Sequence, residues 1–522
     1  MKFYALVMAF AAAQLAAQAP SARLDSQGHL VYAHTAHGDH MADFSYAGYM
    51  GGGVALPAVP AGETLAPSGP DDTAAVQAAL DRIAVQAATK HHALALVLAP
   101  GTFHLSKTIE ITASNVVLRG SGVGKTILIL TGAPHLGIHI GSSTASGEDE
   151  DAATTETPAA ASAVTTTLAP GVFVPSGARS IQVANATGFG TGDTIQIDHP
   201  ITPEYVAFMG MNLPDRDGKP EHWIGSRIVI ERRVASISGN NLTLDVPLTD
   251  SYDPKFGGGE ATRIQKIAPP HRLSQVGVEL LSIACPSVSI NLSDPHFDGI
   301  QIVGTEDAWL RDLRFEDTIN TIRVEATARR ITIDHVDILQ RIPIQSSAKN
   351  FAFSLAGTQT LVMRSAVTGD KVFFAATQAR EQGPNVLLFC EFRGDQSVEP
   401  HQRWGTGFLV DNVNVHGGAI NFINRGTMGS GHGWTIGWGV VWNSSAESLS
   451  VQNPPGAINW AIGSSGQRVG KPMPISGAGS RGRPPLQEGQ FEFPGKRIKP
   501  DSLYLQQLSE RLGPQAVHNI GW

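Results

Sequence analysis

Short runs of apolar residues recur along most of the chain and are separated by turn residues. Five of them follow one another near the N-terminal end, at residues 94–98, 101–105, 109–111, 116–120 and 127–130. Runs this short, rich in Ile, Val and Leu and bounded by Gly, Pro, Ser and Asn, are typical of β-strands. The pattern therefore predicts many short strands joined by tight turns.

The runs repeat with a nearly constant period after residue 280. Residues 300–302 align with residues 322–324 at an offset of 22. Two further sets align in the same way: Leu310, Leu313 and Phe315 fall on Ile333, Val336 and Ile338, and Leu361, Met363 and Val367 fall on Val386, Leu388 and Phe392. Phe351 and Phe353 fall on Ile322 and Val324 at a longer offset of 29. A recurrence of about 22–25 residues indicates the stacked coils of a solenoid.

An antiparallel β-sandwich is the competing explanation, because its strands also recur at short intervals. A sandwich has no fixed coil length, whereas coils that bury a stripe of Ile, Val and Leu against their neighbours must repeat. We therefore predict an all-β protein whose main body is a β-helix.

Two segments have helical periodicity instead. Between residues 76 and 87 the apolar positions are spaced by three and four: Val76, Ala79, Leu80, Ile83 and Ala87. The preceding segment 70–73 supplies Pro, Asp and Thr, which suit a helix start. Residues 501–508 begin with Asp and Ser and predict a second short helix, which would cover the open end of the solenoid.

The chain divides into seven segments on this basis. Residues 141–171 form a Ser/Thr/Ala/Glu tract with few large apolar side chains, and apolar runs near residues 181, 195, 229 and 243 alternate with turns. The predicted segments are a signal peptide at 1–19, an N-terminal extension or cap at 20–70, the first coils at 71–140, a low-complexity linker at 141–171, an inserted antiparallel β subdomain at 172–265, the main β-helix at 266–465 and a C-terminal tail or cap at 466–522. Within the N-terminal extension, residues 43–49 are expected to form a cap or a first strand.

Composition fits an elongated repeat. The chain has 522 residues, too many for one ordinary core, and 56 of them are Gly, while only 16% are charged. The formal net charge is −8 and no Lys/Arg run stands out, so nucleic acid is not an expected partner. An anionic polysaccharide remains compatible, because local Arg and Lys act within a screening length of about 8–10 Å. The oligomeric state is left open.

The N-terminus predicts export. Lys2 is followed by an apolar stretch from residue 3 to residue 17 and a small-residue segment ending at Ala19, which is the order found in secretory signals. A buried first helix is the alternative interpretation. No later stretch reaches the roughly 18–20 apolar residues of a membrane-spanning helix, so we expect a periplasmic or extracellular protein without membrane insertion.

Three motifs near the start resemble a known superfamily. They are the segment 71–80 (DDTAAVQAAL), the segment 100–103 (PGTF) and the segment 117–122 (VLRGSG). Together they resemble the opening of β-helices of the pectate-lyase-like superfamily. The resemblance, which covers residues 71–130 and 280–465, implies a right-handed parallel β-helix and a polysaccharide lyase or glycoside hydrolase. Its motifs specify the fold more than the substrate.

The segment 369–443 concentrates polar and aromatic residue types, so we expect the site there. Cleavage of a uronate polymer by β-elimination needs a cation to neutralise the carboxylate and a base to remove the adjacent proton. We predict Arg403 as the cation and His401 or Lys371 as the base, with Lys371, Arg403 and His432 close together on consecutive coils. The predicted substrate-binding residues are Arg380, Trp404, Asp411, His432 and Trp434.

Other functions remain open. Hydrolysis requires two carboxylates roughly 5–10 Å apart, and the candidates are Asp370, Asp395, Glu399 and Asp411. A β-helix also serves as an adhesin or carbohydrate-binding surface without catalysis.

The sequence offers one candidate metal site and predicts no disulfide. Asp294 and Asp298 are candidate ligands for Ca²⁺, because this ion prefers acidic oxygens, and no other cofactor is predicted. The only cysteines, Cys285 and Cys390, should lie three to four coils apart, about 15–19 Å, beyond the reach of a disulfide.

Overall fold

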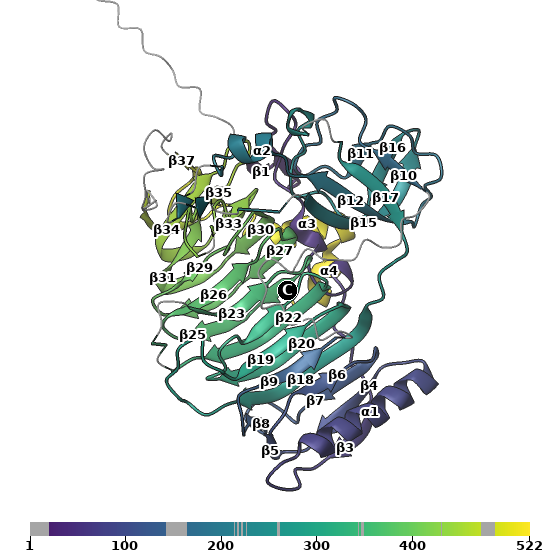
Figure 1. Cartoon of the computed structure of the whole chain (residues 1–522), viewed down its shortest axis with the longest axis vertical. Helices are drawn as coiled ribbons and strands as arrows, with labels where there is room; N and C mark the ends of the chain where they lie inside the picture. Colours follow the sequence, from purple (N-terminus) through teal and green to yellow (C-terminus); the bar gives the residue numbers. More distant parts are fainter. Residues whose placement is uncertain are drawn as a thin grey trace, which may run out of the picture.

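The computed structural model describes residues 20–141, 164–212, 215–216, 219–220, 223–225, 227–257, 261–342, 344–345, 349–429, 431–470 and 486–522. Within them, 28 strands form one continuous sheet system in which almost every pairing is parallel. Figure 1 shows these strands stacked side by side along the molecule. The protein is a right-handed parallel β-helix, as the coil recurrence predicted.

Each coil contributes strands to three stacks, A, B and C. Stack A contains β3 (Ala61–Leu65), β4 (Leu94–Leu98), β7 (Val116–Arg119), the first halves of β18 (Leu273–Ala284), β20 (Thr305–Glu316) and β22 (Arg329–Leu339), then β24 (Leu361–Met363), β27 (Gln382–Leu388), β30 (Gly405–Asp411), β33 (Val440–Trp442), β35 (Trp460–Ile462) and β38 (Gln490–Glu492). Stack B contains β5 (Gly101–Leu105), β8 (Thr126–Leu130), the second halves of β18, β20 and β22, then β25 (Ala366–Thr368), β28 (Glu391–Arg393), the starts of β31 (Asn414–Phe422) and β34 (Ser445–Asn453), and β36 (Ser465–Arg468).

Stack C contains β6 (Ile109–Ile111), β9 (Leu136–Ile140), β19 (Asp298–Ile302), β21 (Ile322–Val324), β23 (Asn350–Leu355), β26 (Val372–Thr377), β29 (Ser397–Val398) and the second halves of β31 and β34. Two short strands add to the coil edges: β32 (Ile436–Gly437) pairs with the start of β30, and β37 (Gln487–Glu488) pairs antiparallel with the end of β34.

The structure confirms most of the predicted alignments. Ile300 pairs with Ile322, Leu310 pairs with Ile333, and Leu361 pairs with Val386. The alignment at an offset of 29 is wrong, because Ile322 pairs with Phe353 at an offset of 31. A shift of two residues keeps every side chain on the same face of a strand, so the apolar pattern alone does not distinguish the two registers.

Inward-facing Ile, Val, Leu and Phe side chains form one continuous core along the axis of the β-helix. Val278, Leu310 and Ile333 lie on successive coils of stack A and are fully buried. Each coil buries its apolar stripe only against the coils on either side, as in other solenoids.

Helix α1 (Thr73–Lys90) packs at the N-terminal end of the stack (Figure 1). Its five buried residues are the ones that the helical spacing predicted: Val76, Ala79, Leu80, Ile83 and Ala87. Asp71 accepts hydrogen bonds from the backbone N–H and hydroxyl of Thr73, which satisfies a free donor at the helix start. The helix therefore covers the first coils.

The N-terminal segment 20–53 is not an end cap. Its hairpin, β1 (Ala22–Leu24) with β2 (Leu30–Tyr32), lies near the C-terminal coils, where Ser21 bonds Trp460 and Glu492. The ordered stretch expected as a first strand instead forms the 3-10 turns η1 (Phe44–Tyr46) and η2 (Tyr49–Gly51). Tyr49 then reaches Trp309 on an early coil, with ring centroids 5.5 Å apart. The segment thus runs along the outer face of stack A.

The predicted C-terminal helix exists as α3 (Leu503–Leu512), followed by α4 (Pro514–Asn519), and Ser502 caps α3 by accepting from Leu505 N–H at 3.2 Å. The prediction that it covers the open end is wrong. Tyr504 donates to the carbonyl of Ala47, and the helices pack with η1 against the outer face of stack A (Figure 1). Amphipathic helices bury their apolar faces against whichever surface is apolar, and here that is the side of the solenoid.

The inserted subdomain is a six-stranded sheet, antiparallel throughout, beside the later coils (Figure 1). Its strands are β10 (Thr165–Thr167), β11 (Ser180–Gln182), β12 (Thr194–Pro200), β15 (Arg227–Ser238), β16 (Asn241–Leu244) and β17 (Arg263–Ile267), and the subdomain also carries α2 (Pro203–Phe208), η4 (Pro254–Phe256) and the hairpin β13 (Asp215–Arg216) with β14 (Lys219–Pro220). The linker prediction is wrong for residues 165–167, because β10 pairs with β17.

Some predictions lie outside the described residues, namely the signal peptide at 1–19 and the linker at 142–163. No helix of the described part is long and apolar enough to cross a membrane. Cys285 and Cys390 are both free thiols, as predicted.

Candidate functional site

The three outer faces of the β-helix differ in what covers them. The N-terminal segment and α3 cover stack A, whereas stack B carries exposed side chains such as Arg393 and His416. Stack C presents a row of outward-facing polar side chains in register on its later coils, and three of them are Glu399, Asn421 and Ser450. All three are less than a tenth exposed. Buried polar groups usually have hydrogen-bond partners, and Asn421 donates to Glu399, so the contacts of these two residues define the candidate site.

Arg425 lies at the centre of this cluster. It follows β31, and its backbone is fixed by a bond from its N–H to the carbonyl of Gly433 at 2.8 Å. Its Nε lies 3.2 Å from Oε1 of Glu399, and its Nη1 lies 2.7 Å from Nδ1 of His401. Glu399 also accepts from the Asn421 amide at 2.6 Å. One guanidinium therefore joins a carboxylate to an imidazole.

Aromatic rings surround His401 beside this cation. The His401 ring meets Phe351 at 4.9 Å and Phe373 at 5.5 Å, both edge to face. The Arg425 guanidinium lies 5.6 Å from the Phe373 ring centre. Phe351 and His401 are partly exposed, whereas Phe373 is 6% exposed. The cluster therefore reaches the surface through Phe351 and His401.

His432 packs against His401, with ring centroids 4.6 Å apart. Burial, together with the charges of Arg425 and Arg403, lowers the pKa of His432 to about 3. Burial, Arg425 and His432 hold the pKa of His401 well below its usual value of 6.5. Both imidazoles are therefore neutral at pH 7.

A glycine allows this packing. Gly429 has a positive φ of 60°, and a Cβ at this position would lie 2.1 Å from Nε2 of His432. The loop therefore accepts the imidazole only if position 429 has no side chain.

The structure brings together three of the predicted residues. Arg403 is buried, and its N–H donates to the carbonyl of His432 at 3.0 Å, which places the two on adjacent coils. Arg380 donates its N–H to the carbonyl of Arg403 at 2.8 Å and lies beside Gly225 of the inserted subdomain. His401, Arg403 and His432 thus share one region, with Arg380 at its edge next to the inserted subdomain.

Lys371 is not part of that region, so the prediction that it neighbours Arg403 is wrong. It precedes β26, where its N–H donates to Asp395 at 2.7 Å and its Nζ donates to the carbonyl of Ile344 at 2.8 Å. His401 bonds the opposite end of β26, at Thr377. Six residues of extended strand separate the two positions, about 20 Å at roughly 3.3 Å per residue.

The two predicted tryptophans do not offer a surface for a sugar. Trp404 is 1% exposed and donates from Nε1 to Asp250 at 2.7 Å, and Trp434 is 3% exposed and donates to the carbonyl of Met209 at 3.0 Å. Both partners belong to the inserted subdomain. These tryptophans attach that subdomain to the coils, and the substrate-binding prediction for them is wrong.

Asp411 is also structural rather than substrate-binding. It is fully buried on stack A and accepts hydrogen bonds from the hydroxyl of Ser502 at 2.7 Å and the N–H of Tyr504 at 2.9 Å. It therefore holds the start of α3 against the coil. Burial raises its pKa to about 6.

The calcium prediction at Asp294 and Asp298 does not fit the structure. Asp298 faces two basic groups, with Nε2 of His296 at 3.3 Å and Nη2 of Arg323 at 3.5 Å. Asp294 accepts from the N–H and the amide of Asn291. Within the part of the chain that the structure describes, no group of three His, Cys, Asp or Glu is placed to hold a metal ion.

Sequence reasoning missed the centre of the cluster. Arg425, Asn421, Phe351 and Phe373 were not candidates, and Glu399 was considered only for hydrolysis. The coil register was the available signal: once β23, β26, β29 and β31 are aligned, Phe351, Phe373 and Asn421 fall on neighbouring rungs of one stack, and Arg425 follows the last of these strands.

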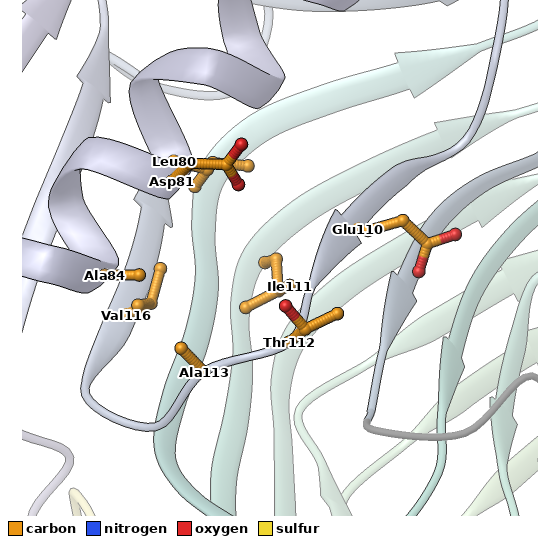
Figure 2. A pocket seen from close by; sticks show the side chains of 8 residues that line it. All are labelled: Leu80, Asp81, Ala84, Glu110, Ile111, Thr112, Ala113 and Val116. Atoms are coloured by element: carbon orange, nitrogen blue, oxygen red, sulfur yellow. The ribbon is translucent and has the colours of Figure 1, made fainter.

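Figure 2 shows a hollow at the other end of the molecule, between α1 and the segment that follows β6. It is lined by Leu80, Asp81, Ala84, Glu110, Ile111, Thr112, Ala113 and Val116. Its volume is about 200 Å³, including space open to solvent, whereas ligand pockets typically measure about 300–1,000 Å³. Glu110 is also paired with His139 at 2.6 Å. This hollow is not the candidate site.

Comparisons with known proteins leave the family undetermined. No family model and no curated protein matches the chain. Solved β-helical structures are similar at low identity. A tailspike of Acinetobacter baumannii bacteriophage AP22, in complex with A. baumannii capsular saccharide, is 11% identical, with 77% of this chain and 70% of that chain covered and a TM-score of 0.23.

Two further structures are similar at the same level. The catalytic domain of a GH87 α-1,3-glucanase is 8% identical, with 84% of this chain and 66% of that chain covered and a TM-score of 0.32. PfbA, a surface adhesin of Streptococcus pneumoniae, is 10% identical, with 82% and 89% covered and a TM-score of 0.23. These values are too low to transfer an activity or a residue role to this chain.

Proposed function

We propose that this protein acts on an acidic polysaccharide at the outer face of stack C. The observation that carries the proposal is the contact set of Arg425, which joins the carboxylate of Glu399, the imidazole of His401 and the ring of Phe373. The guanidinium of Arg425 is 5% exposed and already contacts Glu399 and His401, so it supplies positive charge to this face without clamping the substrate directly. Aromatic rings beside it supply apolar surface against which a sugar ring packs.

The chemistry that we propose is β-elimination. Arg403 and Arg425 supply positive charge beside two neutral imidazoles, and positive charge at a uronate carboxylate acidifies the adjacent C–H. Glu399 is the carboxylate in contact with Arg425, and we assign it the role of the base. Its contacts with Arg425 and Asn421 also hold the cluster together, so its variant must be tested for folding and binding as well as turnover.

Hydrolysis is the weaker alternative, because it needs a second carboxylate near Glu399. Asp411 lies on stack A, held by Ser502 and Tyr504. Asp370 and Asp395 lie with Lys371 at the other end of the strands. None of the carboxylates that the sequence suggested as a pair therefore lies beside Glu399 in the described structure.

We further propose that the protein is exported to the periplasm or the extracellular space and belongs with pectate-lyase-like β-helices. Support comes from the order of residues at the N-terminus and from the opening motifs at 71–80, 100–103 and 117–122. Detection of the processed chain outside the cytoplasm tests export, and a variant that lacks residues 1–19 should stay in the cytoplasm.

A panel of polysaccharides tests the activity. Purified protein is incubated with galacturonan, alginate, a sulfated glycan and a neutral glucan, and both unsaturated-uronate absorbance and new reducing ends are followed. We expect absorbance and reducing ends to rise together on a uronate polymer, and Glu399→Gln to lose turnover but keep binding. Reducing ends without absorbance would overturn elimination. Binding without either signal would indicate an adhesin-like role, and the absence of binding to every polymer would overturn the proposal itself.

A further inference from the structure

The hydrogen bond between Arg425 and His401 determines which imidazole nitrogen carries the proton. Nη1 of Arg425 lies 2.7 Å from Nδ1 of His401. A guanidinium has five N–H donors and no acceptor, so Nδ1 must be the acceptor in this bond. A neutral imidazole carries one proton, which then sits on Nε2. His401 is therefore a donor at Nε2.

The surroundings hold the ring in this state. Nη1 of Arg425 also donates to the backbone carbonyl of His401 at 2.9 Å, so the guanidinium is hydrogen-bonded to His401 at two points. The rings of Phe351, Phe373 and His432 contact the imidazole on its other sides. A rotation of the ring that exchanged the two nitrogens would lose the bond to Arg425 and place two donors against each other.

The charged groups around His401 oppose its protonation. Arg425 touches it directly, His432 packs on it, and Arg403 lies behind His432. Lys349 lies over the Phe373 ring, with Nζ 5.4 Å from its centre. Glu399 is the carboxylate on this face, and it is paired with Arg425. A second proton on His401 would therefore add a positive charge beside two arginines and a lysine.

The remaining nitrogen is available to a ligand. His401 is partly exposed, unlike Arg403 and His432. No residue in the described part of the chain hydrogen-bonds to its Nε2. A donor that is held rigidly at the surface and has no internal partner is suited to an oxygen of a bound molecule.

We propose that Arg425 is a positioning residue that fixes His401 as a hydrogen-bond donor through Nε2, directed at a hydroxyl or carboxylate oxygen of the bound glycan. This reverses the expectation that His401 acts as a base, since its lone pair at Nδ1 is already used by Arg425. The identity of the ligand rests on the proposed function. The protonation state of His401 does not.

Nitrogen NMR of the full chain tests the protonation state without any ligand. The 18 histidines are labelled with ¹⁵N, and the signals of His401 are assigned from the spectrum of His401→Gln. We expect a bare Nδ1 and a protonated Nε2 that do not change between pH 5 and pH 8. A proton on Nδ1, or titration within this range, would overturn the proposal. If the His401 variants do not fold, Phe373→Leu assigns the residue through the altered ring-current shift.

Arg425→Lys tests the positioning role, because lysine keeps the charge but not the planar fork. We expect the His401 signals of this variant to show a mixture of the two protonation forms. His416→Gln, which alters an exposed histidine of stack B, is the matched control and should leave the His401 signals unchanged. Unaltered His401 signals in Arg425→Lys would show that Arg425 does not set the proton position.

Two substitutions of His401 distinguish a requirement for a donor at the position of Nε2 from a requirement for the imidazole ring itself. The amide nitrogen of glutamine lies near the position of Nε2, and that of asparagine lies near the position of Nδ1. We expect His401→Gln to weaken polysaccharide binding less than threefold and His401→Asn to weaken it more than tenfold. Equal losses would overturn the role toward the ligand. If no polysaccharide binds the parent protein, the proposed function fails while the NMR result stands.

Discussion

Trp404 donates from its indole nitrogen to Oδ2 of Asp250 at 2.7 Å, and this bond joins the β-helix to the inserted subdomain. Asp250 is buried at the interface, and its burial raises its pKa to about 6. The pair therefore makes the attachment of the subdomain sensitive to pH.

Stability should depend on pH through Asp250. Because its folded pKa of about 6 lies above the unfolded value of 3.8, its contribution is most favourable at low pH and is lost as the pH rises from about 4 to about 6. Two pKa units correspond to about 3 kcal/mol as an upper bound. We expect Asp250→Asn to gain stability relative to the parent as the pH rises through this range, measured by denaturant unfolding at several pH values. A pH-independent difference between the two proteins would contradict this assignment.

Asp411 should matter for stability rather than for substrate. Asp411→Ala leaves the hydroxyl of Ser502 and the N–H of Tyr504 without their acceptor, and unsatisfied buried donors cost about 1–3 kcal/mol each. We expect the free energy of unfolding to fall by about 2–5 kcal/mol, with α3 losing protection in hydrogen exchange. Asp501→Ala is the matched control: its side chain is 68% exposed, and the change should stay within about 0.5 kcal/mol.

The aromatic side of the site should contribute to affinity. We expect Phe351→Ala to weaken binding of an acidic polysaccharide about tenfold, equivalent to about 1.4 kcal/mol, because the partly exposed ring beside His401 would be lost. Binding can be followed by calorimetry. Phe493→Ala removes a ring that is 40% exposed, on the segment after β38, and should leave the affinity unchanged. An equal loss in both variants would place binding elsewhere.

Lys371 and Arg425 distinguish the site expected from sequence from the site that the structure assembles. Arg425→Ala should abolish polysaccharide cleavage, because it removes the group that contacts both Glu399 and His401. Lys371→Ala should retain at least half of the parental rate, since Lys371 contacts Asp395 and Ile344 at the other end of β26. Steady-state rates on the same polymer provide the measurement. A loss of activity in the Lys371 variant would show that Lys371 belongs to the catalytic region after all.

Local sequence patterns predicted the helices and strands well where the side chains of one element, or of one repeat, are enough to determine it. The spacing of Val76 and Ile83 located α1 and its buried face. The coil offset located the pairing of Ile300 with Ile322. In both cases the information lies within a few residues or within one repeat, because burial on one face imposes a period on the sequence.

The candidate site was predicted only in part for the same reason. His401 and Arg403 were found because they lie two positions apart in the sequence and are chemically distinctive. Trp404, their neighbour, has the same local appearance, yet its ring turns into the interface with Asp250. Which side of a turn a residue faces depends on the packing of the inserted subdomain, and residue type does not encode it.

The sequence by itself determined the stacked strands, the first helix and the existence of an inserted sheet, since each follows from the periodic burial of apolar side chains. Only the tertiary structure decided that residues 20–53 and α3 cover stack A, which leaves stacks B and C uncovered. It alone also brought Arg425 to Glu399 and His401. These contacts join residues on successive coils, about 24 positions apart. Because the register of whole coils determines which residues become neighbours, no local sequence pattern predicts these contacts.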